Sequence, residues 1–349
     1  MKRIFGPYLA WPVSLTFVGL LLAGWIGWIT TQTVAGALSF LFIGSMLAVL
    51  EIALSFDNAI VNANKLKTMS PIWQRRFLTW GILIAVFGMR IVFPVAVVAV
   101  AAWINPFEAI RLAISEPTEY AHIIEGSHGS ITAFGGTFLM MVALSYFIDQ
   151  DKEIDWLTGL ECQLRRCGSV RGLEIGLLML IVLCLSAFVP EDEQAGFLFA
   201  SILGFLVFTA VDVLGRVFDE DSQAIKAGAA QGGLGAFLYL EVLDASFSFD
   251  GVIGAFALST NIFLIAIGLG IGALYVRSMT IMLLETGTLM QFRYLEHGAF
   301  YSILFLSVLM LVQSLVHIPE AVTGLTGVFI VGLSLFSSIR HNIRHPKAS

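Results

Sequence analysis

Long apolar stretches separated by short polar segments run through the whole chain. Windows of roughly 20 mostly apolar residues fall at about 10–30, 35–63, 77–104, 129–148, 171–189, 195–215, 232–258, 262–287, 299–317 and 320–339. A helix of about 20 apolar residues crosses the hydrocarbon core of a bilayer. The pattern therefore predicts an all-α polytopic membrane protein with about ten transmembrane helices.

The composition agrees with this class. Hydrophobic residues make up 58% of the chain, charged residues 13%, and the mean hydropathy is +0.88, which excludes an ordinary soluble domain. No basic run carries interleaved aromatic residues, so we expect no nucleic-acid partner. The cysteines Cys162, Cys167 and Cys184 fit neither a disulfide framework nor a zinc pattern, which favours ordinary reduced thiols.

The positions of lysine and arginine test the number of spans, because cytoplasmic loops of membrane proteins are enriched in both residues. With the N-terminus inside, the outer connections hold only Arg111, and Arg90 and Arg277 fall inside spans. The remaining basic residues lie in inner segments: Lys2, Arg3, Lys65, Lys67, Arg75, Arg76, Lys152, Arg165, Arg166, Arg171, Arg216, Lys226, Arg293, Arg340, Arg344 and Lys347. We therefore expect both termini in the cytoplasm and the protein in a bacterial inner membrane.

Two similar acidic segments lie inside predicted spans. They are Glu51–Asn58 in the second span and Asp244–Gly251 in the seventh, which is preceded by Glu241. A carboxylate at the centre of a spanning helix costs roughly 2.5–3.5 kcal/mol on insertion scales, so such acids are rare and usually functional or paired. The repetition of this arrangement predicts a functional site at the two acidic segments.

The topology relates the two segments to each other. The second span runs inward and the seventh runs outward, and each is followed by a span with one arginine, Arg90 or Arg277. This predicts two inverted membrane halves, residues 1–190 and residues 191–349, which commonly place a substrate site near the bilayer midplane.

Helix geometry adds a condition on the acids. In a regular helix Glu51 and Asp57 lie about 120° apart around the axis and about 9 Å apart along it, so both cannot hold one ion. Either the backbone opens near Ser55 and again near Ser248, or one acid of each pair binds the ion while the other meets an arginine. Broken or kinked helices at both segments are the expectation for the fold.

The polar side chains inside the spans favour a hard cation. Acids outnumber the two intramembrane arginines, and a surplus of negative charge in low dielectric is relieved by a bound cation or by protons. Carboxylate, amide, hydroxyl and carbonyl oxygens suit Mn²⁺, Ca²⁺ or Mg²⁺, whereas the absence of His and Cys from both segments counts against zinc or copper. The candidate metal ligands are Glu51, Asp57, Asn58, Glu241, Asp244 and Asp250, with Ser55, Ser248, Arg90 and Arg277 in support.

A second acidic feature lies in the long outer loop after the third span. Residues Glu116, Glu119, His122, Glu125 and His128 recur at intervals of three on a predicted interfacial helix. Either they form a stripe that captures metal, or they are acids that keep the loop solvated.

The chain resembles the TerC-like integral membrane proteins, within the LysE-type transporter group, and is most similar to a TerC-related branch. The likeness lies in three segments: Glu51–Asn58, Gln74–Ile82 leading to Met89 and Arg90, and Asp250–Phe263 leading to Val276, Arg277 and Ser278. The resemblance implies export of a divalent metal, chiefly manganese or calcium, an association with tellurite resistance, and metal-binding roles for Asp57, Asn58 and Asp250. This chain departs from it in its extra spans and in Gly251, which stands where the first segment has Asn58.

We expect a non-enzymatic exporter of Mn²⁺ or Ca²⁺ that works by alternating access, with no organic cofactor. Its partners would be the metal ion and the lipid bilayer, with proton coupling and a homo-oligomer left open. One alternative is a non-transporting membrane component of a metal or tellurite stress response, with its inner loop, residues 149–171, as the docking surface. A remote alternative is an intramembrane aspartyl protease, although the Gly-x-Gly-Asp context of that class is missing.

Overall fold

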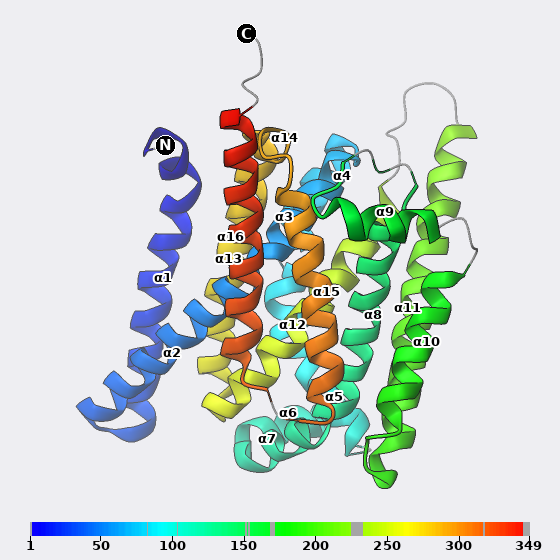
Figure 1. The fold of residues 1–349 in the computed structure, drawn as a ribbon. Coiled ribbons are helices and arrows are strands. Elements are labelled where there is room, and N and C mark those ends of the chain that lie inside the picture. Colours follow the sequence, from blue (N-terminus) through cyan, green and yellow to red (C-terminus); the bar gives the residue numbers. More distant parts are fainter. Residues whose placement is uncertain are drawn as a thin grey trace.

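The computed structural model describes residues 2–344 apart from residues 82, 103, 151, 153, 168–171, 225–232 and 317, and every regular element in them is helical (Figure 1). The elements are α1 (Lys2–Thr31), α2 (Val34–Leu54), α3 (Phe56–Lys67), α4 (Pro71–Arg76), the π-helical segments η1 (Phe77–Gly81) and η2 (Ile84–Val92), α5 (Phe93–Ala101), α6 (Pro106–Ser115), α7 (Pro117–Gly126), α8 (His128–Ile148), α9 (Thr158–Cys167), α10 (Leu173–Ser186), α11 (Glu191–Ala224), α12 (Leu234–Leu258), α13 (Ile262–Glu285), α14 (Thr288–Gln291), α15 (Leu295–Gln313) and α16 (Glu320–Arg344).

Eight stretches in the described part of the chain are helical, long and apolar enough to cross a membrane. They are Tyr8–Thr31, Val34–Leu54, Pro71–Val100, His128–Ile148, Glu191–Leu214, Ile262–Glu285, Leu295–Gln313 and Val322–Arg344. The two other predicted spans are present as α10, which has only 14 residues, and α12, whose 25 residues include three acids. The protein is therefore an integral, polytopic, all-α membrane protein.

The helices form a bundle with α8 at its centre. Helix α8 packs against α11, α12 and α15, and most of its side chains are buried. Helices α1 and α2 lie at one edge of the bundle and α10 and α11 at the other (Figure 1). Close packing of α11 on α8 requires Gly204, because a Cβ atom there would lie 2.4 Å from the carbonyl oxygen of Phe134.

The outward faces of the bundle are apolar. Large hydrophobic side chains are exposed along α1, α11 and α16, among them Phe17, Leu21, Phe199, Leu325 and Phe336. Contiguous apolar surface of this extent is unfavourable in water and is typical of contact with lipid.

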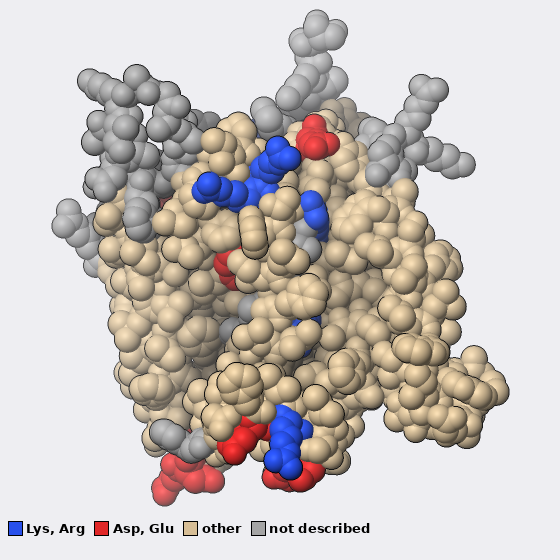
Figure 2. Space-filling view, turned by 180° about the vertical axis from the view of Figure 1, so that it is seen from behind, with Lys and Arg blue, Asp and Glu red and all other residues tan. Residues whose placement is uncertain are grey.

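The polar connections separate into two ends. Helices α4, α9 and α14 lie at the end where α1 begins and α16 finishes, and α6 and α7 lie at the other (Figure 1). We call the first the basic end, after Lys65, Lys67, Arg75, Arg76, Lys152 and Arg165, and the second the acidic end, after Glu108, Glu116, Glu119, Glu191 and Glu193. In Figure 2 most of the described basic side chains on the visible face lie near one end, and most acidic ones near the other.

A buried carboxylate anchors α9 at the basic end. Glu161 is fully buried and accepts hydrogen bonds from Lys152 Nζ at 2.6 Å, from the backbone N–H groups of Trp156 and Leu157 at 3.1 and 2.9 Å, and from the Tyr301 hydroxyl at 3.1 Å. Tyr301 belongs to α15. One carboxylate therefore fastens the segment around α9 to a core helix.

This anchor should weaken in acid. Burial opposes the charged form of Glu161, but the hydrogen bonds from Lys152 and Leu157, together with nearby His297, hold its pKa below the ordinary 4.5. A lowered pKa contributes stability that is present above about pH 4.5 and is lost as the pH falls through the folded-state value. Hydrogen-exchange protection factors of residues 154–165, corrected for intrinsic rates, should be high at neutral pH. They should decrease once the pH is lowered below about 4.5. Glu161→Gln should lower them already at pH 7, and protection that persists unchanged at about pH 3 would contradict the assignment.

Candidate functional site

The first acidic segment is the point where one predicted span divides in two. Helix α2 ends at Leu54 and α3 begins at Phe56, with Ser55 between them at φ −107° and ψ 10°. Helix α2 runs obliquely to the other helices of the bundle (Figure 1). The opening predicted near Ser55 is therefore present.

The second acidic segment does not open, so the break predicted around Ser248 is wrong. Helix α12 continues without interruption from Leu234 to Leu258, and Ser248 is buried within it. Gly251 has a different use, because a Cβ atom there would lie 2.6 Å from Oε2 of Glu51. This glycine lets α12 approach the carboxylate of the first segment without bending.

Glu51 forms an ion pair inside the bundle. It is 2% exposed, as is its partner Arg90, which is carried by η2. Arg90 also donates from Nη1 to the carbonyl oxygen of Ala85 at 2.5 Å. A Cβ atom on Gly272 would lie 2.1 Å from Cγ of Glu51, so α13 also needs a glycine beside this pair.

Asp57 and Asn58 are neighbours in the first turn of α3 but contact different helices. Asp57 accepts a hydrogen bond from the Ser302 hydroxyl of α15 at 2.6 Å, and its other oxygen accepts from the Asn58 backbone N–H at 2.9 Å. The Asn58 side chain donates from Nδ2 to Asp244 of α12 at 2.5 Å. The two acidic segments, far apart in the sequence, therefore meet directly.

Asp244 interacts electrostatically with several of the other charged side chains near the two acidic segments. It interacts with Glu51 and Glu241 as a like charge and with Arg90 as an opposite charge. A cavity of about 40 Å³ beside it is lined by side chains that include Arg90, Glu241, Asp244 and Arg277. This is room for at least one water molecule.

Among the residues that the structure describes, several polar atoms around this cavity have no hydrogen-bond partner. They include Oδ1 of Asn62, Oε1 of Glu241, and Nε of both Arg90 and Arg277. Arg277 places its guanidinium over the ring of Trp11, 5.7 Å from the centroid. Unpartnered buried polar atoms are unfavourable in a dry protein, so this pocket suits a polar occupant.

The predicted ligands are therefore brought together in part. Glu51, Asn58, Glu241 and Asp244 form one connected group, and Asp57 adjoins it through Asn58. Within the described residues, no three His, Cys, Asp or Glu side chains gather closely enough to hold a metal by themselves, and the stripe from Glu116 to His128 forms no such group. The Asp250 side chain lies outside what the structure describes, although its backbone belongs to α12.

Sequence reasoning missed the residues that complete the site from other helices. Ser302 and Asn62 each touch or face the acidic group, yet neither belongs to a recognisable motif. Asn62 offers one signal, because it lies four residues after Asn58 and therefore on the same face of α3.

Residues 56–345 match the model of a family described as "Protein of unknown function (DUF475)". No curated protein matches the chain, and no solved structure matches it.

The Glu51–Arg90 pair should behave as a unit in stability measurements. Glu51→Gln or Arg90→Met alone removes one partner of a buried ion pair, which typically costs about 3–5 kcal/mol. The double variant removes both charges of this pair and should lose clearly less than the sum of the two. Unfolding free energies in mixed micelles titrated with sodium dodecyl sulfate measure this, with Glu285→Gln, an exposed acid on α13, as control. Strict additivity would mean that the two side chains are energetically independent.

Proposed function

The chain belongs to the DUF475 family, a family of unknown function, and we propose that this member transports a hard divalent cation, Mn²⁺ or Ca²⁺, across the membrane. One observation carries the proposal: the Asn58–Asp244 hydrogen bond joins two acidic segments from different helices inside an apolar bundle. Buried intramembrane acids are rare and mark ion pathways or paired charges.

The pairing of Glu51 divides the acids by role. Because Glu51 already faces Arg90, the oxygens left for a cation are those of Asp57, Asn58, Glu241 and Asp244, with Oδ1 of Asn58 unpartnered. These are the ligand types that Mn²⁺, Ca²⁺ and Mg²⁺ prefer. We infer that the ion replaces the Asn58–Asp244 hydrogen bond and binds between α3 and α12.

Alternating access between inverted halves is the transport mode that we propose for this site. Helix α3 packs on α15 and α2 packs on α13, and the counterpart contacts are those of α12 with α8 and with η2. Such matched contacts are expected if residues 1–190 and residues 191–349 are related by a two-fold axis in the membrane plane. The TerC-like segments favour the same interpretation, with the basic end in the cytoplasm of a bacterium, in accordance with the excess of lysine and arginine there.

The alternatives gain less support. In an aspartyl protease two aspartates share one water molecule, whereas here Asp57 contacts Ser302 and Asp244 contacts Asn58. A scaffold would offer its inner loop for docking, yet the part around α9 is fastened to α15 through Glu161.

Transport should depend on Asp57. Proteoliposomes are loaded with Mn²⁺, Ca²⁺, Mg²⁺ or Zn²⁺. Those that contain the native protein should release Mn²⁺ or Ca²⁺ faster than protein-free vesicles loaded with the same ion. Asp57→Asn keeps the size of the side chain but removes its charge, and should slow this release by about tenfold or more. Glu108→Gln, an exposed change on α6, should match the native rate. Equal release from native and Asp57→Asn vesicles would refute the transport proposal.

A further inference from the structure

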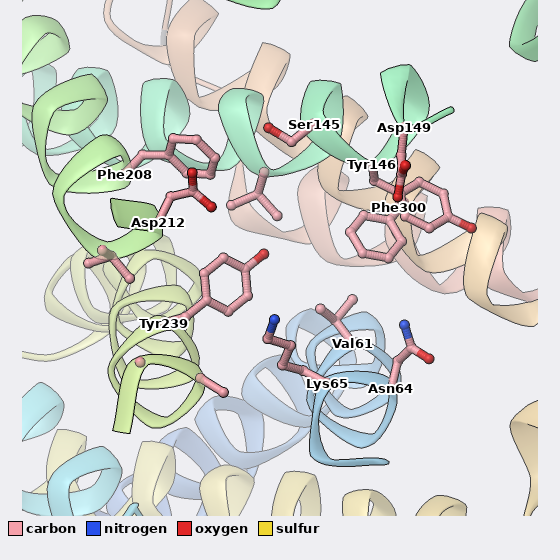
Figure 3. Close-up of a pocket in the computed structure, with 14 residues that line it drawn as sticks. Val61, Asn64, Lys65, Ser145, Tyr146, Asp149, Phe208, Asp212, Tyr239 and Phe300 are labelled. Carbon is pink, nitrogen blue, oxygen red and sulfur yellow. The ribbon is translucent and has the colours of Figure 1, made fainter. Parts of the chain in front are cut away.

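Two cavities follow one another along α3 and α12. The larger one lies toward the basic end, has a volume of about 380 Å³ and is lined by side chains of α3, α8, α11, α12 and α15 (Figure 3). The two helices face each other across it at Lys65 and Tyr239, with Nζ 5.3 Å from the ring centroid. Further along the same helices, Asn62 and Glu241 line the cavity of about 40 Å³ beside Asp244. An ion that enters from the basic end therefore meets Asn62 and Glu241 before Asp244.

Asn62 and Glu241 lie at a level of their own, one helical turn from the hydrogen bond between Asn58 and Asp244. Along α3, Asn62 is four residues, or about 6 Å, from Asn58. Along α12, Glu241 is three residues, or about 4.5 Å, from Asp244. The two displacements are similar and both point toward the basic end, so each helix contributes one oxygen-bearing side chain to each level.

The oxygen atoms at this level have no hydrogen-bond donor. Asn62 is 3% exposed, and within the described residues neither its Oδ1 nor Oε1 of Glu241 has a hydrogen-bond partner. Thr280 of α13 lines the same cavity and donates its hydroxyl hydrogen to the carbonyl oxygen of Val276 at 2.9 Å, so its oxygen can still bind an ion. Buried oxygens without donors are unfavourable in a dry protein and are the ligands that a hard cation prefers.

The charges nearest to Glu241 also favour a cation. Glu241 interacts with Asp244 as a like charge, and it forms no salt bridge within the described part of the chain. Two arginines line the same cavity, but Arg90 is paired with Glu51 and Arg277 lies over a tryptophan ring of α1. A cation beside Glu241 relieves the repulsion between the two acids.

The size of the smaller cavity limits how much water the ion can keep. A space of about 40 Å³ holds about three water molecules at roughly 10–15 Å³ each, so an ion with a full octahedral shell of water does not fit. The ion fits once about half of that shell has been replaced by oxygens of Asn62, Glu241 and Thr280. The larger cavity, of about 380 Å³, has room for the complete shell.

We propose that Asn62, Glu241 and Thr280 form a second cation position, where an ion from the basic end exchanges part of its water for protein oxygens. Asn62 binds the ion through Oδ1, and the ion then moves one helical turn to the site between α3 and α12 at Asp244. This inference rests on the proposed transport function, but the position itself is also testable without transport.

The first experiment compares Asn62→Leu with Asn62→Asp in Mn²⁺ transport by proteoliposomes. Leucine has a similar size but no oxygen, and should lower kcat severalfold because the ion loses water without a replacement. Aspartate keeps the oxygen and adds a charge, so it should bind the ion more tightly and lower the KM severalfold. Asn342→Leu, the same change at an exposed position of α16, should match native protein.

A purely structural role of Asn62 predicts that neither change lowers the KM. An unchanged kcat of Asn62→Leu, or a KM of Asn62→Asp that is not lowered, therefore overturns the inference. Absence of Mn²⁺ transport by native protein instead overturns the proposed function, and the second experiment then decides about the cation position.

The second experiment uses Cd²⁺ binding, measured by isothermal titration calorimetry. In a chain whose three cysteines are changed to serine, Asn62→Cys replaces the amide by a thiol, a ligand that soft metal ions prefer. If positions 62 and 241 hold one ion, adding Glu241→Gln should weaken Cd²⁺ binding about tenfold or more. Asn64→Cys, on the same helix but outside the smaller cavity, should show no such dependence. A Cd²⁺ affinity of Asn62→Cys that does not respond to Glu241→Gln overturns the inference independently of any ion flux.

Discussion

A carboxylate inside an apolar helix bundle is stable only if a neighbouring group compensates its lost hydration, and this requirement shapes the centre of the molecule. The Glu51–Arg90 pair is the clearest case, since both side chains are 2% exposed. Around it the helices approach closely, with Gly251 of α12 and Gly272 of α13 leaving room for the Glu51 side chain. Three helical segments are thus positioned by one buried acid.

The remaining acids have weaker hydrogen-bond partners. This difference distinguishes Glu51, which supports the structure, from the acids of the proposed ion site. Asp57 and Asp244 accept hydrogen bonds from a hydroxyl and an amide, which an incoming cation can replace at modest cost, and Asp244 also interacts with Arg90 as an opposite charge. Glu51 faces the full positive charge of Arg90, which an incoming cation does not replace at similarly low cost. The same chain thereby contains an acid paired with an arginine and acids held by neutral donors, and the difference arises from which helix lies opposite each one.

Much of the fold follows from the sequence because hydropathy reports directly on lipid contact. The helical class, most spans and the opening at Ser55 were predictable from residue periodicity and from the distance between Glu51 and Asp57. Helix α12 was expected to break near Ser248 but is continuous, and Gly251 in the same segment meets a requirement for close packing. Ser302 was not predictable, since its importance depends on which distant segment it faces. The ion pair of Glu51 with Arg90 was one of two alternatives that helix geometry left open, and the first segment has both this pair and the opening at Ser55.

The most direct test of a cation site in the bundle is anomalous diffraction from crystals equilibrated with Mn²⁺. If the transported ion binds between α3 and α12, an anomalous peak should lie within coordination distance of Asp57, Asn58 or Asp244. A map with no manganese peak in the bundle, or with peaks only at the acidic end, would contradict it.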